Sequence, residues 1–293
     1  MKPPNNRRQI VTLTTDWVDK SYYVSTIEKD YVPKTYPIGD HYVAQLKGVL
    51  KQISQDIEIV DISHSVQAFN AIQAGFVLRS AFRFYPEGTI HIVGVNSEPS
   101  PSNKLILIKY MGHYFIGAND GMFSLVFEDN PDTNPEFVLE LPLVENFYGF
   151  SALMTFAFVV RHLTNQKEPS MLGKPCEMIE RPAPSATYND NFIYGRVVFV
   201  DHFGNLITNI SRELFETVRD KRPFRIVVNT DKLTITQISS YYDDVAPNQY
   251  LALFNSNNIL EIAKRNSNLA QLENLDTKTS IVVEFSNDKL FFN

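Results

Sequence analysis

Short apolar runs alternate with longer amphipathic segments through the first half of the chain, and this alternation limits the possible folds more than any other feature. The short runs are predicted strands, at residues 10–15, 57–62, 90–95, 105–110 and 114–116. The longer segments carry apolar residues at helical spacing and are predicted helices, at residues 40–55, 68–84 and 151–163. Such alternation is typical of an α/β fold with a central, largely parallel sheet.

The second half of the chain is different, because nearly every signal there is for a strand. Prolines and polar residues gather at residues 169–190, which we interpret as a linker. Strands are then predicted at residues 192–200, 206–210, 224–228, 232–238, 250–254 and 281–285. The pattern therefore predicts an α/β domain at residues 1–168, followed by a smaller antiparallel sheet or barrel at residues 191–293.

A long tyrosine-rich insertion at residues 17–38 interrupts the first predicted domain. It is longer than an ordinary connection between a strand and a helix. Both a lid over a site and a simple surface excursion fit this composition.

Charge and composition exclude several classes of function. The chain of 293 residues has a net charge of -6 and no basic patch, so we expect no nucleic-acid partner. Its six histidines lack the spacing of metal ligands, and we expect no metal site. No apolar run approaches the length that spans a bilayer, and the single cysteine fits a reducing compartment. We therefore expect a cytoplasmic protein with no membrane partner.

Three groups of polar residues each fit two interpretations. Residues 201–210 follow an apolar run and combine an acid, an aromatic residue, two asparagines and a glycine. Gly204 and Asn205 indicate a hairpin turn, but an asparagine can also pair with the edge of a purine. Asp40 precedes a predicted helix, either as its N-cap or as an acceptor for ribose hydroxyls. Residues 61–64 end a strand, either as a capped loop or as part of an α/β site.

Taken in order, several stretches resemble the S-adenosylmethionine hydroxide adenosyltransferases, a family related to the fluorinase and chlorinase enzymes. The matching stretches are residues 10–16, 39–48, 60–65, 84–89, 116–121, 201–210, 255–256 and 260–263. These stretches are distributed along nearly the whole chain. The resemblance implies an N-terminal Rossmann-like α/β domain with a mostly parallel sheet and a C-terminal antiparallel β-barrel. It also implies a homotrimer, with each site between the first domain of one subunit and the second domain of its neighbour.

The resemblance assigns residues to the ribose and methionine parts of S-adenosylmethionine. Asp40 would bind the ribose hydroxyls, and Phe69 would line the ribose pocket. Asp201 and Ser256 would hold the methionine amino group. Asn257 stands where halogenating relatives have an arginine for the methionine carboxylate.

For adenine, the resemblance implies contacts with Phe203 and Asn205. An aromatic face contributes roughly 1–3 kcal/mol for each base that stacks on it. The remaining substrate-binding positions that it implies are Asp16, Phe147 and Asn255. No cofactor is expected beyond the substrate itself.

The catalytic positions are where this chain departs from the hydrolytic members of the family. Those members use an Asp, an Arg and a His, which align with Asn96, with the neighbourhood of Lys104, and with Tyr148. An amide cannot act as a base, and tyrosine, with an ordinary pKa of about 10, is mostly protonated near neutrality. Tyr148 and Gly149, preceded by Phe147, look more like the halogenases. The predicted catalytic set is Asn96, Lys104, Tyr148 and Gly149.

The chemistry that the resemblance implies is displacement at the 5′ carbon. Because the sulfonium is a cationic leaving group, no acid is needed to expel methionine. The protein must orient the nucleophile and remove its water shell. We predict an S-adenosylmethionine-cleaving enzyme that uses water and gives adenosine and methionine. Two alternatives stay open: a non-catalytic protein that binds S-adenosylmethionine or adenosine, and a halide-using relative.

Overall fold

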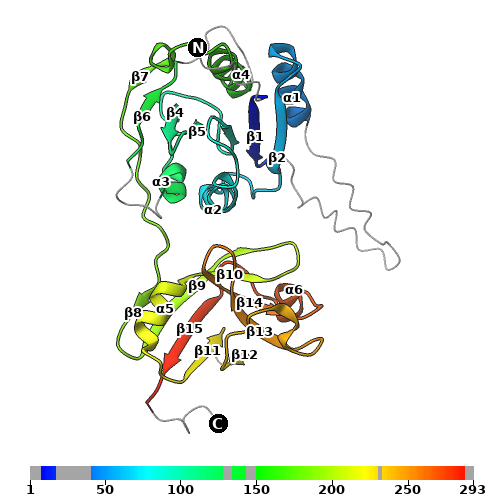
Figure 1. The fold of residues 1–293 in the computed structure, drawn as a ribbon, viewed down its shortest axis with the longest axis vertical. Helices are drawn as coiled ribbons and strands as arrows, with labels where there is room; N and C mark the ends of the chain where they lie inside the picture. The colour runs from blue at the N-terminus through cyan, green and yellow to red at the C-terminus, as the bar shows by residue number, and fades with distance from the viewer. Residues whose placement is uncertain (1–7, 18–40, 128–133, 143–149, 230–232, 288–293) are drawn as a thin grey trace, which may run out of the picture. The chain divides into compact units, whose positions relative to one another are not determined.

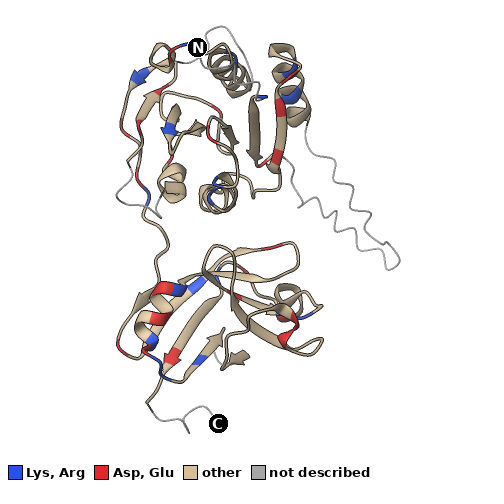
Figure 2. Ribbon diagram, viewed as in Figure 1, with Lys and Arg blue, Asp and Glu red and all other residues tan. Residues whose placement is uncertain are grey.

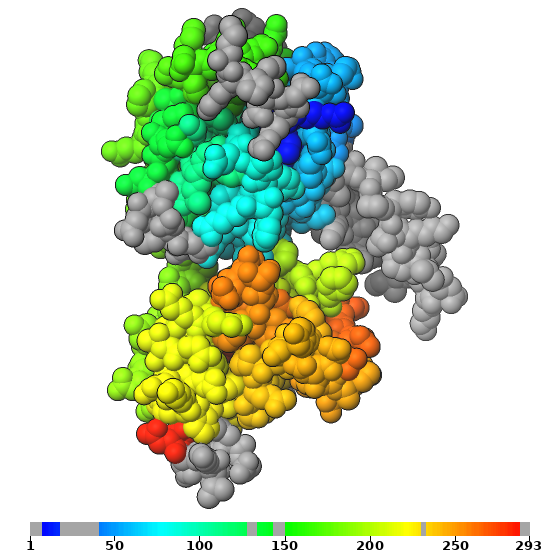
Figure 3. All heavy atoms as spheres, in the orientation of Figure 1, coloured from blue at the N-terminus to red at the C-terminus, as the bar shows by residue number. Residues whose placement is uncertain are grey.

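The computed structural model describes residues 8–17, 41–127, 134–142, 150–229 and 233–287 (Figure 1). The chain divides into two compact units, Met1–Arg181 and Pro182–Asn293. Among the described residues, no helix has both the length and the apolar character needed to cross a membrane. The side chains of each unit fill the gaps that separate its ribbons (Figure 3).

The first unit is built on a sheet whose described strands number seven, in the order β2-β1-β3-β5-β4-β6-β7. Four neighbours are parallel, namely β2 (Glu58–Ser63), β1 (Ile10–Thr15), β3 (Ile90–Gly94) and β5 (His113–Ala118). The other three add antiparallel pairs on one side, namely β4 (Leu105–Tyr110), β6 (Phe137–Glu140) and β7 (Lys174–Pro175). The carboxyl ends of the parallel strands therefore meet at one edge.

Helices cover both faces of this sheet (Figure 1). One core cluster joins α1 (His41–Ile53) and α4 (Ala152–Thr164) to the sheet. A second core cluster joins α2 (Ala71–Phe82) and α3 (Met122–Phe127) to the opposite face. A short 3₁₀ helix, η1 (Pro169–Leu172), follows α4. This arrangement confirms the expected α/β unit with parallel central strands.

Strand β1 shows why its sequence suits the centre of such a sheet. Successive side chains point to opposite faces of a strand, so Val11 and Leu13 join the cluster under α1 and α4. Thr12 and Thr14 point to the other face and are also fully buried. A strand with both faces covered is nearly continuous in buried residues, as this one is.

The second unit is an antiparallel sheet that curls into a nearly closed barrel, which confirms the expected second fold. The described strand order is β12-β11-β15-β9-β10-β14-β13, with β8 paired to β9. A bridge between Ile238 and Ala252 links the region after β12 to β13. The strands are β8 (Thr187–Tyr188), β9 (Phe192–Val200), β10 (Leu206–Ser211), β11 (Phe224–Val228), β12 (Leu233–Ile235), β13 (Tyr250–Phe254), β14 (Ile259–Lys264) and β15 (Ser280–Phe285).

Among the described residues of this unit, three short helical elements accompany the barrel: α5 (Arg212–Arg219), η2 (Tyr242–Asp244) and α6 (Leu269–Glu273). A large buried cluster fills its interior, and Phe215 of α5 and Leu269 of α6 belong to it. Residues 169–190, expected as a linker, contain η1 together with β7 and β8. Acidic and basic residues are interspersed in both units (Figure 2).

Candidate functional site

The carboxyl edge of the parallel sheet collects three polar residues of the first unit. Asp16 directly follows β1, while Asn96 and Asp120 follow β3 and β5 after one intervening residue each. These three strands are parallel neighbours in the order β1-β3-β5, so their ends lie side by side. Ligand sites of α/β folds form at this edge of the sheet.

Asp16 is held by backbone groups from two other loops. Its Oδ2 accepts the N–H of Phe69 at 2.8 Å, and the backbone of Asn96 lies close enough to the carboxylate to lower its pKa. Burial raises the pKa of Asp16 above its usual value, although these backbone groups oppose the shift. The carboxylate is fixed in direction and keeps lone pairs for a ligand.

Phe69 has an unusual backbone for a bulky residue. Its φ is +62°, in the left-handed region, and its side chain is 75% exposed. Strained residues of this kind cluster at ligand sites, and each costs on the order of 1–3 kcal/mol. The hydrogen bond to Asp16 holds the strained conformation, and Asn70 then caps α2 by accepting the N–H of Gln73.

Asn96 connects the ends of all three strands. Its φ is +48°. Its backbone oxygen accepts a hydrogen bond from Asn103 Nδ2 at 2.7 Å, while its own Nδ2 donates to Asp120 Oδ2 at 3.3 Å. Asp120 Oδ1 accepts the N–H of Met122 at 3.1 Å, at the start of α3. The side chains of residues 96 and 120 thus face each other across the gap between β3 and β5.

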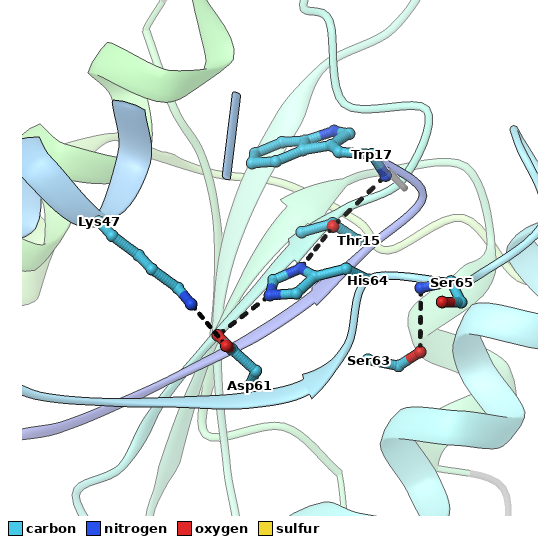
Figure 4. A network of polar contacts seen from close by, with 7 residues as sticks. All are labelled: Thr15, Trp17, Lys47, Asp61, Ser63, His64 and Ser65. Atoms are coloured by element: carbon cyan, nitrogen blue, oxygen red, sulfur yellow. Dashed lines mark hydrogen bonds and ion pairs between the residues drawn. The ribbon is translucent and has the colours of Figure 1, made fainter. Parts of the chain in front are cut away.

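A chain of polar contacts fixes the backbone on both sides of Asp16 (Figure 4). The N–H of Trp17 donates to Thr15 Oγ1 at 3.4 Å, and that hydroxyl lies 2.9 Å from His64 Nδ1. His64 Nε2 lies 3.0 Å from Asp61 Oδ1, and Lys47 Nζ lies 2.5 Å from Asp61 Oδ2. Burial alone would raise the pKa of Asp61, but its contacts with the lysine and the histidine outweigh burial and lower it.

Aromatic rings pack against Trp17, the residue that follows Asp16. The indole of Trp17 meets Phe150 edge-on at 5.2 Å and Tyr42 edge-on at 6.3 Å between ring centroids. The same indole lies directly on Gly94, where any Cβ would overlap it. Only glycine at the end of β3 allows this close approach.

In the second unit, the segment after β9 is the hairpin turn that its sequence indicates. Gly204 has a φ of +83°, and a Cβ there would overlap Asn268. Asp201 Oδ1 accepts the N–H of Asn205 at 2.8 Å, and its Oδ2 accepts Asn205 Nδ2 at 3.0 Å. Phe203 is 72% exposed at the tip. The turn therefore fixes a carboxylate and an amide together and presents an aromatic ring to the outside.

A buried carboxylate lies near this turn. Glu261 is 4% exposed, and it accepts hydrogen bonds from Tyr242 at 2.5 Å and from Asn255 Nδ2 at 3.3 Å. Burial and the charge of Asp201 raise the pKa of Glu261, although its two donors oppose the shift. Burial, the hydrogen bond to Glu261 and nearby negative charge also raise the pKa of Tyr242. Asn255 Oδ1 accepts the N–H of Asn257, and Ser256 between them is exposed.

The sequence matches both domains of one family. It matches the S-adenosylmethionine hydroxide adenosyltransferase N-terminal domain over residues 36–173 and the C-terminal domain over residues 195–282. The chain belongs to this family.

Relatives of this chain include proteins named as hydrolases of S-adenosylmethionine and proteins named as fluorinases. The (R)-S-adenosyl-L-methionine hydrolase of Methanocaldococcus jannaschii is 24% identical over 284 residues, which cover 91% of this chain and 92% of that protein. A fluorinase of Actinopolyspora mzabensis is 25% identical over 211 residues, which cover 61% of this chain and 70% of that protein. A crystal structure of an uncharacterized conserved protein from Thermotoga maritima has a TM-score of 0.75 at 26% identity. It covers 94% of this chain and 100% of that chain.

The structure brings together some of the residues that the resemblance to the adenosyltransferases selected. In the first unit, Phe69 donates a hydrogen bond to Asp16 and the backbone of Asn96 lies near the same carboxylate, and in the second unit Asp201 pairs with Asn205. Lys104 is engaged elsewhere, because its Nζ lies 3.1 Å from Glu140 Oε1. Four predicted positions lie outside the described residues: Asp40, Phe147, Tyr148 and Gly149.

Sequence reasoning missed three polar residues of these clusters: Asp120, Tyr242 and Glu261. Asp120 lies within a stretch that resembles the family, but its partner Asn96 is on another strand, 24 residues away. Glu261 sits among the apolar residues of β14, and an acid inside a buried strand was the available signal.

Proposed function

We propose that this protein cleaves S-adenosylmethionine by attack of water at the 5′ carbon and releases adenosine and methionine. The observation that carries the proposal is the cluster at the strand ends, where Asp16 and Asp120 flank Asn96. Two carboxylates favour a cationic substrate, and a sulfonium is a cation. The relatives named as hydrolases of this compound support the same substrate.

The two halves of the substrate have matching groups in this proposal. Asp16 keeps carboxylate lone pairs for ribose hydroxyls, and Phe69, whose backbone N–H binds that carboxylate, has an exposed ring. In the second unit, Asp201 supplies negative charge for the methionine ammonium, and Asn205 with Phe203 suits adenine. Asp40 and Ser256 are further binding positions on the family resemblance, and Asp40 lies outside the described residues.

A halide-using reaction is the second candidate, because a relative is named fluorinase. The charges at the strand ends argue against it. A halide at Asn96 would lie next to the Asp120 carboxylate, which is hydrogen-bonded to that amide at 3.3 Å. Like charges at such separations repel each other. Neutral water suffers no such repulsion.

Chromatography of the reaction products tests the proposal. The purified protein is incubated with S-adenosylmethionine, with and without added chloride, and adenosine, 5′-chloroadenosine and methionine are quantified. We expect adenosine and methionine in equal amounts in both reactions. Unchanged substrate with measurable binding by calorimetry would support the non-catalytic alternative, and 5′-chloroadenosine would support the halide-using one.

A further inference from the structure

We propose that Asp120 is the general base of the reaction, taking the proton of the attacking water, and that Asn96 is the residue that positions it. This inference rests on the proposed function. The hydrolytic members that this chain resembles carry an acid where it has Asn96, so this chain lacks a base at that position. The amide at position 96 touches a carboxylate from the neighbouring strand end, Asp120.

The backbone of Asn96 is held on both sides, which fixes the direction of its amide. Its carbonyl oxygen accepts from Asn103 Nδ2 at 2.7 Å, and its backbone lies close enough to the carboxylate of Asp16 to lower the pKa of that group. An amide has two N–H donors and one acceptor oxygen. One donor is directed at Asp120 Oδ2, and the remaining groups can hold a water molecule next to that oxygen.

Asp120 has one oxygen for structure and one for chemistry. Its Oδ1 accepts the N–H of Met122 at 3.1 Å, which anchors the carboxylate at the start of α3. Its Oδ2 faces Asn96. A carboxylate oxygen has two lone pairs, so Oδ2 can accept one hydrogen bond from the amide and another from water. Asp120 is partly exposed, so water can reach it.

The proton balance of the step is simple. The water oxygen forms a bond to the 5′ carbon while the carbon–sulfur bond breaks. The electron pair of the broken carbon–sulfur bond goes to sulfur. The sulfonium becomes the neutral thioether of methionine. One proton of the attacking water moves to Asp120 Oδ2, and the carboxylic acid then returns it to solvent. A positioned general base contributes about 100-fold to 10,000-fold to the rate.

Exchange of the two side chains tests the assignment. Asp120→Asn keeps an oxygen for the N–H of Met122 but removes the base. We expect its kcat to fall at least about 100-fold with KM within about threefold of the parent value. The double variant Asn96→Asp with Asp120→Asn restores one carboxylate and one amide at the same contact, and we expect its kcat to exceed that of Asp120→Asn at least about tenfold.

Two further variants separate chemistry from folding. Asp120→Ser removes the carboxylate yet retains an acceptor for the start of α3, and we expect the same loss of kcat. Asp56→Asn removes an exposed acid from the turn before β2 and should leave kcat unchanged. Thermal unfolding and calorimetry with S-adenosylmethionine check that each variant folds and binds.

The outcomes distinguish this inference from the function on which it rests. A parent protein that yields no adenosine overturns both. If the parent is active and either folded variant of Asp120 keeps the parent kcat, the assignment of the base is wrong while the proposed function stands. Failure of the double variant to recover any rate over Asp120→Asn would contradict the positioning role of Asn96.

Discussion

Two residues of the candidate site have features that cost stability in the protein alone. Phe69 adopts a φ of +62° with its ring exposed, and Asp16 keeps a carboxylate that burial disfavours. Both features cost free energy in the protein alone. A ligand that accepts the ring and the charge would offset those costs.

The variant Asp16→Asn tests this trade between stability and binding. Because burial raises the pKa of Asp16, ionisation is less favourable in the folded protein than in the unfolded chain. The contribution of Asp16 to the free energy of unfolding therefore decreases as the pH rises through the ordinary aspartate pKa of about 4 and beyond. At pH 7 we expect Asp16→Asn to unfold at a temperature no lower than the parent, measured by calorimetry. KM for S-adenosylmethionine should rise at least about tenfold. A destabilised variant with unchanged KM would contradict this role for Asp16.

Gly204 provides a second test at the same scale. Its φ of +83° and its contact with Asn268 leave no room for a methyl group, so Gly204→Ala should lower the free energy of unfolding by about 2 kcal/mol or more. Gly48 is the matched control, because it lies on the exposed face of α1, where a methyl group would meet no atom within 4 Å. Gly48→Ala should raise stability by about 0.5–1 kcal/mol. Urea unfolding measures both, and equal effects would refute the account of the turn.

At the scale of elements, local pattern predicted strands well and long-range contacts poorly. The predicted ranges of β1, β9, β11 and β13 agree with the structure, because their apolar runs are bounded by turn residues. Helix α2 begins at Ala71 rather than at residue 68, because the side chain of Asn70 caps it. Strand β14 was not predicted as a strand.

The same limit applies to the candidate site. The Asp201–Asn205 turn could be read from ten consecutive residues, since its partners are local. The contact between Asn96 and Asp120 joins the ends of β3 and β5. The local sequence of neither segment predicts that these two strands are neighbours in the sheet. Periodicity locates a strand along the chain, but pairing decides which side chains meet.

A buried pair of histidines, His91 on β3 and His113 on β5, makes the stability of the fold depend on pH. Thr12 Oγ1 lies 2.7 Å from His91 Nδ1, and His91 Nε2 lies 3.2 Å from His113 Nδ1. Burial and the neighbouring histidine lower the pKa of His91 to about 3. Burial also lowers the pKa of His113, although Glu87 opposes the shift.

These histidines should weaken folding in mild acid. The unfolded chain protonates His91 near its ordinary pKa of about 6.5, while the folded protein does not until about pH 3. Stability is therefore complete above pH 6.5 and falls by about 1.4 kcal/mol per pH unit for this group as the pH decreases between those values. Near pH 5, the free energy of unfolding of the parent, measured with urea, should therefore fall by about 1.4 kcal/mol more per pH unit of acidification than that of His91→Gln. Exposed His41→Gln is the control, and equal slopes in all three proteins would contradict the prediction.

For the whole molecule, the two units each contain a separate core and carry different parts of the proposed chemistry. The strand-end cluster belongs to Met1–Arg181, and the carboxylate–amide turn belongs to Pro182–Asn293. Both domains of the family are present in this order. Cleavage should therefore require residues of both units.

The homotrimer implied by the family resemblance remains a prediction at this scale. Native mass spectrometry should give a particle of about three times the chain mass of 33.5 kDa. The variant Phe203→Ala, which removes an exposed ring from the second unit, should keep that mass and raise KM about tenfold, because a stacked base contributes roughly 1–3 kcal/mol. A strictly monomeric particle that is active would contradict the trimer.

The central claim is that water attacks the 5′ carbon of S-adenosylmethionine, and isotope labelling tests it most directly. The reaction is run in water enriched in oxygen-18, and adenosine and methionine are analysed by mass spectrometry. We predict one atom of oxygen-18 in adenosine, at the 5′ hydroxyl, and none in methionine. Adenosine without the label, or no adenosine from protein that binds the substrate, would contradict the account.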